Sequence, residues 1–153
     1  MKFIADAMLG RLARWLRFLG FDTLYYYGIS DSNLVRIARE QDRTILTRDT
    51  RLIKRKGLGS NILITSNDPF NQLLEVVRSF NLSRFDFLGR CVKCNGELLK
   101  VADKEQVKDA VPEFVFLQHN DFLKCPDCGK IYWQGSHPKK FREKVAEIIS
   151  DGS

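Results

Sequence analysis

Residues 2–20, KFIADAMLGRLARWLRFLG, contain the first strand and the first helix of a pattern that repeats along the chain. Phe3-Ile4-Ala5 is a short apolar run followed at once by Asp6, which predicts a buried strand that ends in a carboxylate. Residues 7–19 then show helical spacing, and Gly20 is a typical helix end. The apolar face of this helix is Leu12, Trp15, Leu16 and Leu19, and the other faces carry Arg11, Arg14 and Arg17.

The alternation of strand and helix continues to about residue 80. Further strands are predicted at residues 22–27, 43–47 and 61–65. One helix is predicted after Ser30–Ser32, with an apolar stripe of Leu34, Ile37 and Ala38. A short basic helix is predicted at 50–56, and a longer helix from Asp68-Pro69 to about Phe80. This order predicts an α/β fold, a parallel sheet with helices on both faces.

Three aspartates follow the first three predicted strands: Asp6, Asp31 and Asp49. The carboxyl ends of parallel strands meet at one edge of a sheet, where ligands gather. Three carboxylates at one edge repel each other, and a hard cation such as Mg²⁺ or Mn²⁺ relieves the repulsion. Such ions activate a water and stabilise the leaving oxygen of a phosphodiester. Each aspartate by itself also fits a helix cap, so the joint placement is what favours catalysis.

Charged side chains near these strand ends complete the predicted site. Glu40 and Asp42 flank the same region, with Glu40 at a helix end. Arg48 and Arg51 bracket Asp49 and Arg11 follows Asp6, which suits them to hold substrate phosphates or to balance the acids.

All four cysteines lie in two Cys-x-x-Cys turns, Cys91–Cys94 (the first knuckle) and Cys125–Cys128 (the second knuckle). Two such turns supply the four thiolates of a tetrahedral zinc site. Two disulfides or a redox pair are the alternatives, and the absence of a signal peptide and the matched copies argue against them. Each knuckle is followed by Asn95 or Gly129, which tolerate a left-handed backbone. With four sulfur ligands the site is closed, which predicts a structural rather than a catalytic zinc.

Short hairpins around the metal are expected in the second part of the chain. Strands are predicted at Leu98–Val101 and Ile131–Trp133, residues 103–110 are helix-capable, and a last helix is predicted over 138–149. Phe114–Leu117 is apolar with aromatic or β-branched side chains, a composition typical of a strand. Tyr132 and Trp133 suit either a stacked base or a small core. These patterns predict two domains, residues 1–85 and 86–153.

Charge is distributed unevenly over the 153 residues. Residues 1–85 carry 14 Lys/Arg and 8 Asp/Glu, a net charge of +6, and residues 86–153 carry 11 of each. Arg dominates the excess and suits phosphate recognition in a nucleic acid, and a solvated, salt-bridged basic surface is the alternative. The sequence has no apolar run long enough for a membrane span, which predicts a soluble, cytoplasmic protein without a membrane partner.

Several motifs together resemble one known family over nearly the whole chain. They are Asp6-Ala7-Met8-Leu9-Gly10-Arg11-Leu12-Ala13-Arg14-Trp15-Leu16-Arg17, then Asp31, then Ile45-Leu46-Thr47-Arg48-Asp49, the two knuckles, and Tyr132-Trp133-Gln134-Gly135-Ser136-His137. The chain resembles the PIN-like (Rossmann-like) ribonucleases with a fused C-terminal zinc ribbon, named for the C-terminal domain of mutator exoribonucleases.

The resemblance implies a Mg²⁺- or Mn²⁺-dependent site and RNA cleavage. The family's acids fall on Asp6, Asp31 and Asp49, and Glu40 matches the family pattern less closely. A fuller PIN domain has a fourth acid and an extra helical pair after the second helix, where this chain is short. The residues expected to contact RNA are Arg11, Arg14, Arg48, Arg51 and His137.

Two functions of different classes follow from these observations. The first is a metal-dependent endoribonuclease. The second is a non-catalytic RNA-binding module whose zinc ribbon docks on RNA or on protein. The sequence is also compatible with a homo-oligomer. A receiver-type phosphoacceptor requires an acidic pair after the first strand, and a dehydrogenase requires Gly-x-Gly-x-x-Gly there; the sequence has neither.

Overall fold

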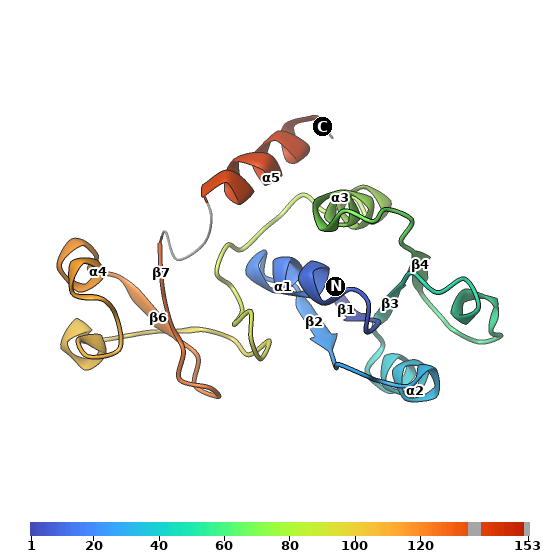
Figure 1. Ribbon diagram of the computed structural model, residues 1–153, viewed down its shortest axis with the longest axis horizontal. Helices are drawn as coiled ribbons and strands as arrows, with labels where there is room; N and C mark the ends of the chain where they lie inside the picture. Colours follow the sequence, from blue (N-terminus) through green and yellow to red (C-terminus); the bar gives the residue numbers. More distant parts are fainter. Residues whose placement is uncertain (135–138, 152–153) are drawn as a thin grey trace. The chain divides into compact units, whose positions relative to one another are not determined.

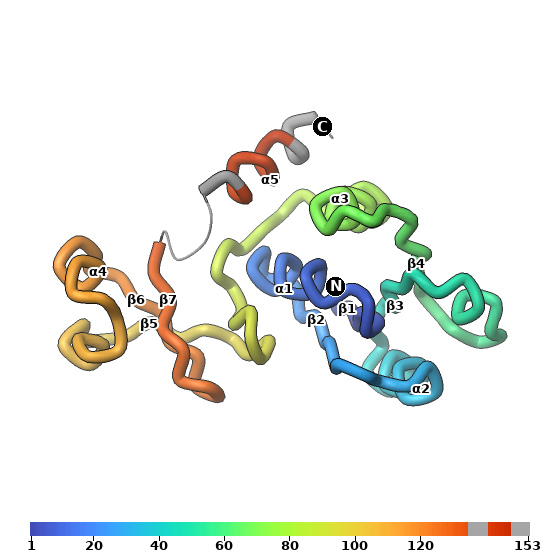
Figure 2. The backbone as a smooth tube through the Cα atoms, viewed as in Figure 1, coloured from blue at the N-terminus to red at the C-terminus, as the bar shows by residue number. Residues whose placement is uncertain are grey.

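The computed structural model describes residues 1–134 and 139–151 (Figure 2). The chain divides into two compact units, Met1–Asn95 and Gly96–Ser153. Across the described residues, every helix is too short or too polar to cross a lipid bilayer.

The first unit is built on a four-stranded sheet whose strands all run parallel. The strands are β1 (Lys2–Ala5), β2 (Asp22–Tyr25), β3 (Thr44–Thr47) and β4 (Asn61–Leu63). Their order across the sheet is β2-β1-β3-β4, so β1 and β3 are central and β2 and β4 are the edges. In register, Ala5 lies opposite both Tyr25 and Leu46. The predicted parallel sheet is therefore confirmed.

Helices cover both faces of this sheet, as predicted. They are α1 (Gly10–Phe18), α2 (Asp31–Gln41) and α3 (Pro69–Ser79). Figure 1 shows α1 and α3 on one face and α2 on the other. On the α2 face, Ile4 and Ile45 pack with Leu34 and Ala38. On the other face, the ring of Phe3 contacts Phe21 and Phe80, with centroids 6.0 and 5.8 Å apart.

Two helical segments are shorter than predicted. The first helix begins at Gly10 and not at residue 7, because the N–H of Met8 donates to Asp6 Oδ1 and that of Leu9 to the Asp6 carbonyl, which closes a turn. The basic segment at 50–56 forms only the 3₁₀ helix η1 (Leu52–Lys54). Its N–H groups reach back three residues rather than four.

The second unit contains a three-stranded antiparallel sheet. Its elements are β5 (Leu99–Lys100), η2 (Lys104–Val107), α4 (Glu113–Gln118), β6 (Phe122–Lys124), β7 (Ile131–Trp133) and α5 (Lys139–Asp151). The second knuckle is the turn of the β6–β7 hairpin. The predicted hairpin and final helix are thus present.

Phe114–Leu117, whose composition is typical of a strand, lies instead within helix α4. Val111 and Val115, four residues apart, are buried with Phe116 in one cluster, while Phe114 and Leu117 are exposed. That pattern is helical, and Pro112 at the N-cap fits the start of a helix. Local packing therefore outweighs the β-propensity of the aromatic and β-branched side chains.

Candidate functional site

The carboxyl edge of the first sheet carries the three predicted aspartates. Asp6 directly follows β1, Asp49 lies two residues beyond β3, and Asp31 is the first residue of α2, which follows β2. Asp6 is buried, with 8% of its surface exposed, and the other two are half-buried. The topology therefore brings all three to neighbouring strand ends, as parallel connections require.

Asp6 is held by three donors from its own unit. Its Oδ2 accepts from Thr47 Oγ1 at 2.6 Å and from the Arg48 N–H at 2.8 Å, and its Oδ1 accepts from the Met8 N–H at 2.8 Å. Thr47 Oγ1 also accepts from the N–H of Asp49 at 2.9 Å. One hydroxyl thus links the first and third aspartates, so the Thr-x-Asp sequence after β3 has a direct structural meaning.

Asp49 and Asp31 are less constrained than Asp6. Asp49 Oδ1 accepts from the Arg51 N–H at 2.8 Å, which closes a local turn. Asp31 lies in the first turn of α2, whose N-cap is Ser30, so Asp31 itself is not the cap. Within residues 1–134 and 139–151, the side chains of three or more acids do not converge as tightly as the four cysteines do. An ion shared by the aspartates would therefore need water ligands as well, which Mg²⁺ usually keeps.

Glu40 and Asp42, which were expected to flank this site, lie instead at the opposite edge of the sheet, where α2 ends and β3 begins. Glu40 lies nine residues after Asp31 on α2, roughly 13 Å along the helix axis. Its carboxylate pairs with Arg36 at 3.2 Å on an exposed face. The helix runs back across the sheet between these two positions, which is why an acid near its end cannot join Asp31.

A fourth acid, which sequence reasoning missed, lies beyond β4. The Glu75 carboxylate on α3 accepts from the N–H of Thr65 at 3.1 Å, from the Thr65 hydroxyl, and from the Ser66 N–H at 3.4 Å. These bonds tie α3 to the end of β4, which makes Glu75 a structural link. Spacing along the sequence gave no signal for it, since the contact depends on how α3 returns to the sheet.

The arginines expected to hold phosphate differ in exposure. Arg11, Arg14 and Arg51 are exposed, and Arg48 is half-buried. Arg48 Nε is buried and has no hydrogen-bond partner in the described part of the chain. The remaining predicted contact, His137, lies outside the described residues.

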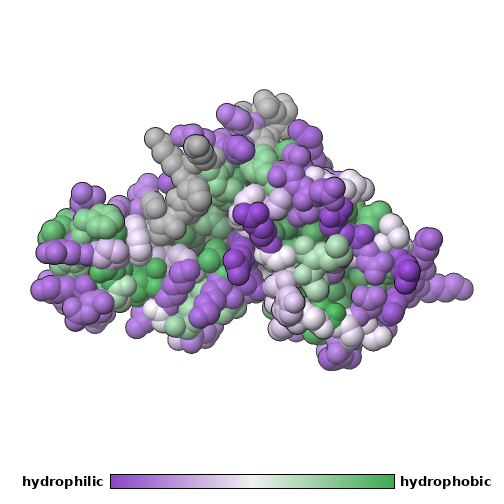
Figure 3. Space-filling view, viewed as in Figure 1, coloured by the Kyte–Doolittle hydropathy of each residue, from purple (hydrophilic) through white to green (hydrophobic). Residues whose placement is uncertain are grey.

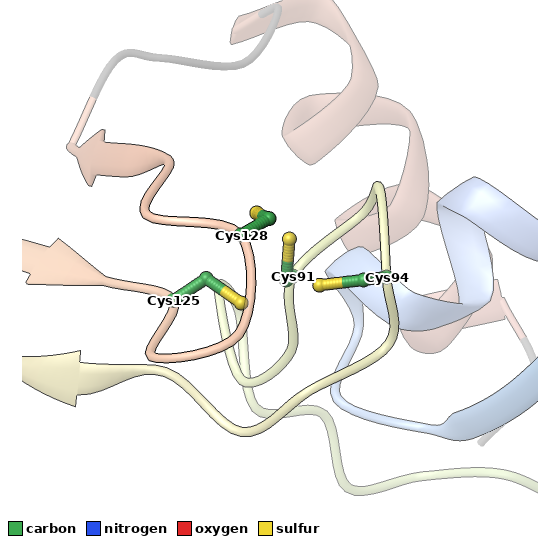
Figure 4. Close-up of side chains that lie close together, drawn as sticks. All are labelled: Cys91, Cys94, Cys125 and Cys128. Carbon is green, nitrogen blue, oxygen red and sulfur yellow. The ribbon is translucent and has the colours of Figure 1, made fainter.

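The four cysteines form the second candidate site (Figure 4). Their sulfur atoms all lie within 4.8 Å of one another, and none is in a disulfide. A tetrahedral zinc with Zn–S bonds of about 2.3 Å places its sulfur ligands roughly 3.8 Å apart, so small movements suffice. Asn95 and Gly129 have φ of 69° and 79°, which confirms the predicted left-handed turns. In each knuckle that residue's N–H donates to the carbonyl of the first cysteine at 2.8 Å.

The first knuckle is bound to the edge strand β2 by a buried arginine. Arg17 Nε donates to the Thr23 carbonyl at 2.8 Å, and its Nη1 donates to the carbonyls of Val92 and Lys93 at 2.9 and 3.2 Å. Arg17, which was expected on a face of the helix other than the apolar one, is buried. Desolvation lowers the pKa of Arg17, and the nearby Cys91 and Cys94 partly offset this effect. Arg17 therefore brings positive charge close to two of the thiolates.

Asn95 completes the link between the knuckle and β2. Its Oδ1 accepts from the Thr23 N–H at 3.0 Å, and its Nδ2 donates to Asp22 Oδ1 at 2.7 Å. Asp22 also pairs with Arg43 at 2.7 Å. Burial opposes the charge of Asp22, but the hydrogen bonds from Arg43 and Asn95 outweigh it, so the pKa of Asp22 lies below its ordinary value. Sequence reasoning gave Asn95 only a turn role and missed these bonds.

The first unit is a parallel α/β sheet with aspartates at its strand ends, and the four cysteines form a site that fits zinc. The protein is therefore of the α/β class and carries a candidate zinc site. Comparison with known families then identifies it more closely. The family model described as Mut7-C RNAse domain matches residues 1–145, and the chain belongs to that family. No curated protein and no solved structure matches the chain. Membership confirms the resemblance to the family named for the C-terminal domain of mutator exoribonucleases and indicates a ribonuclease-related function with RNA as substrate.

Proposed function

We propose that this protein is a metal-dependent endoribonuclease of the PIN type. It hydrolyses RNA phosphodiester bonds at the carboxyl edge of the first sheet, with Asp6, Asp31 and Asp49 as the acidic residues. The observation that carries the proposal is the link from Asp6 through the Thr47 hydroxyl to Asp49, at adjacent ends of β1 and β3. Family membership supports the same chemistry.

The carboxylates suit a hard divalent ion. Asp6 Oδ1 accepts one hydrogen bond, and the only bond that the described residues make to the Asp49 carboxylate is at Oδ1, so both acids keep oxygen lone pairs for a ligand. A bound Mg²⁺ or Mn²⁺ would supply an activated water and charge stabilisation at the leaving oxygen. The chain's own contribution is positioning: Thr47 and the Arg48 N–H fix the orientation of Asp6. The exposed guanidinium groups of Arg11 and Arg51 are available to the substrate phosphates.

Cleavage of a circular single-stranded RNA tests the proposal directly, because a circle has no ends for an exonuclease. The zinc-loaded chain should linearise it with Mn²⁺ or Mg²⁺ and should be inactive without added metal. Asp49→Asn and Asp31→Asn should each lower the rate by a hundredfold or more at unchanged fold, since each removes an anionic ligand.

The matched control is Asp42→Asn. Asp42 caps the other end of α2 with φ 53°, which asparagine also adopts, so this variant makes the same charge change at the opposite edge. It should cleave at the wild-type rate. Equal activity in Asp49→Asn, Asp31→Asn and Asp42→Asn would rule out the aspartate site.

A non-catalytic RNA-binding module is the second candidate. One observation favours it: the three aspartates do not converge as closely as the cysteines within the described residues, and three donors already occupy Asp6. Its signature would be salt-dependent RNA affinity without turnover in either metal. The ribbon would then dock on RNA or on a protein partner.

A further inference from the structure

Three large side chains project into solvent at the edge that carries the aspartates. Tyr27 is 93% exposed, Met8 68% and Tyr26 46%. Met8 belongs to the turn that leaves β1 after Asp6, and the two tyrosines directly follow β2. An aromatic ring as exposed as Tyr27 makes almost no contact within its own chain, so packing does not explain it.

The sheet register places these tyrosines beside the acidic edge. Ala5 and Tyr25 are paired in neighbouring parallel strands, and Asp6 and Tyr26 are the next residues of each. The backbones of adjacent strands lie about 4.8 Å apart, so Tyr26 leaves β2 next to the point where Asp6 leaves β1. Along the chain, the pair lies between Tyr25 and Asp31.

The turn that presents the two rings is held by its neighbours. The Tyr25 hydroxyl donates to the Ala7 carbonyl at 2.9 Å, which ties the end of β2 to the turn after β1. Gly10 leaves room for the Tyr25 ring, because a Cβ there would lie 3.1 Å from it. Gly28, with φ 76°, and the bond from the Ile29 N–H to the Tyr26 carbonyl close the following turn. Tyr25 thus faces inward and Tyr26 and Tyr27 face solvent.

The basic side chains around the exposed tyrosines favour a nucleic acid over an apolar protein segment as the ligand of this surface. Arg11, exposed in the first turn of α1, follows the same β1 connection, and Arg51, exposed, follows β3 at the same edge. Hydrophilic side chains also project from the loop between β3 and β4 (Figure 3), whose basic residues are Arg51, Lys54, Arg55 and Lys56. Exposed aromatic rings between arginines are the usual means of binding an unpaired strand, in which bases stack and phosphates pair with cations.

We propose that Tyr26 and Tyr27 form a stacking platform for unpaired bases beside the aspartates of this edge. Met8 adds apolar surface beside them, and Arg11 and Arg51 pair with the phosphates. The inference rests on the proposed function for its substrate. A duplex hides its base faces, so the platform selects single strands and presents the adjoining phosphodiester to the aspartates.

Binding without turnover tests this inference separately from catalysis. In the zinc-loaded Asp49→Asn chain, the affinity for a fluorescein-labelled single-stranded RNA is measured by anisotropy at fixed salt, with the matching duplex as competitor. Tyr27→Ala should weaken single-strand binding about fivefold or more, and Tyr27→Phe should retain it, because stacking needs the ring and not the hydroxyl. Tyr27→Trp should bind as well, and its indole fluorescence should be quenched by the RNA.

The control is Phe114→Ala, which removes an exposed ring from the second unit and should leave the affinity unchanged. Equal affinity of Tyr27→Ala and the control, an unquenched Tyr27→Trp indole, or equal binding of duplex and single strand would overturn the platform. Binding only to a protein partner would overturn it too. Tyr27-dependent RNA binding by a chain that never cleaves RNA would uphold the platform and refute the nuclease proposal.

Discussion

At the scale of single residues, Thr47 determines how the candidate site is held. Its buried hydroxyl donates to Asp6 Oδ2 and accepts from the Asp49 N–H, so it serves both acids at once. Thr47→Val has nearly the same shape but removes both bonds. We expect the free energy of unfolding to fall by about 1–3 kcal/mol, because a buried carboxylate oxygen and a partly buried N–H lose a partner. Chemical denaturation measures this change.

The conservative variant separates the hydroxyl from the methyl group. Thr47→Ser keeps both hydrogen bonds and should retain most of the RNase activity, whereas Thr47→Val should lower the apparent affinity for Mn²⁺. Equal metal dependence of the two variants would mean that Thr47 has no part in orienting Asp6. Sequence alone predicted the aspartates after the strands, but not this link. The hydroxyl reaches Asp6 only because β1 and β3 are neighbours in this particular register.

At the scale of elements, the first knuckle covers the open edge of the sheet. β2 is an edge strand, and the N–H and carbonyl of Thr23 on its outer side are satisfied by Asn95 and Arg17. Uncovered edge groups are a liability, since they pair with other strands. A metal bound by Cys91 and Cys94 should therefore stabilise the β2 edge through the knuckle between them.

Removal of zinc tests this coupling. Chelation should raise the hydrogen-exchange rate of the Thr23 amide by tenfold or more, while amides of central strand β3 change much less. Asn95→Gly is the matched variant, because glycine keeps the left-handed turn and loses only the side-chain bonds. It should bind zinc nearly as well as the wild type yet exchange Thr23 quickly. Slow exchange in both the chelated protein and Asn95→Gly would show that the knuckle does not protect β2.

The strands and helices were largely predictable from the sequence, but the side-chain contacts between them were not. Every strand of the first sheet and helices α2 and α3 follow from apolar periodicity and caps. Arg17 was expected only to lie on a face of the helix other than the apolar one, and nothing in the local pattern predicted its burial. Its burial depends on three carbonyls, two of them from residues more than seventy positions away, and a local pattern cannot encode such a contact.

At the scale of the whole molecule, sequence analysis located the basic excess in residues 1–85, and the aspartates and exposed arginines of the candidate site lie in that same part of the chain. In the first unit, side chains from segments far apart in the sequence also contact one carboxylate, that of Asp22. Asp22 pairs with Arg43 before β3 and with Asn95 after the first knuckle, and it approaches Arg90 at 3.9 Å. The stability of the unit should thus depend on the ionisation of Asp22.

The direction of that pH dependence follows from the lowered pKa of Asp22. A carboxyl group with a lower pKa in the folded than in the unfolded state contributes stability above its unfolded value, about 3.9, and loses it as pH falls through the folded value. Thermal or urea denaturation from neutral pH to about pH 3 should show a steeper loss for the wild type than for Asp22→Asn. Asp121→Asn, at an exposed position, should follow the wild type. Parallel profiles for the wild type and Asp22→Asn would show that ionised Asp22 does not stabilise the unit.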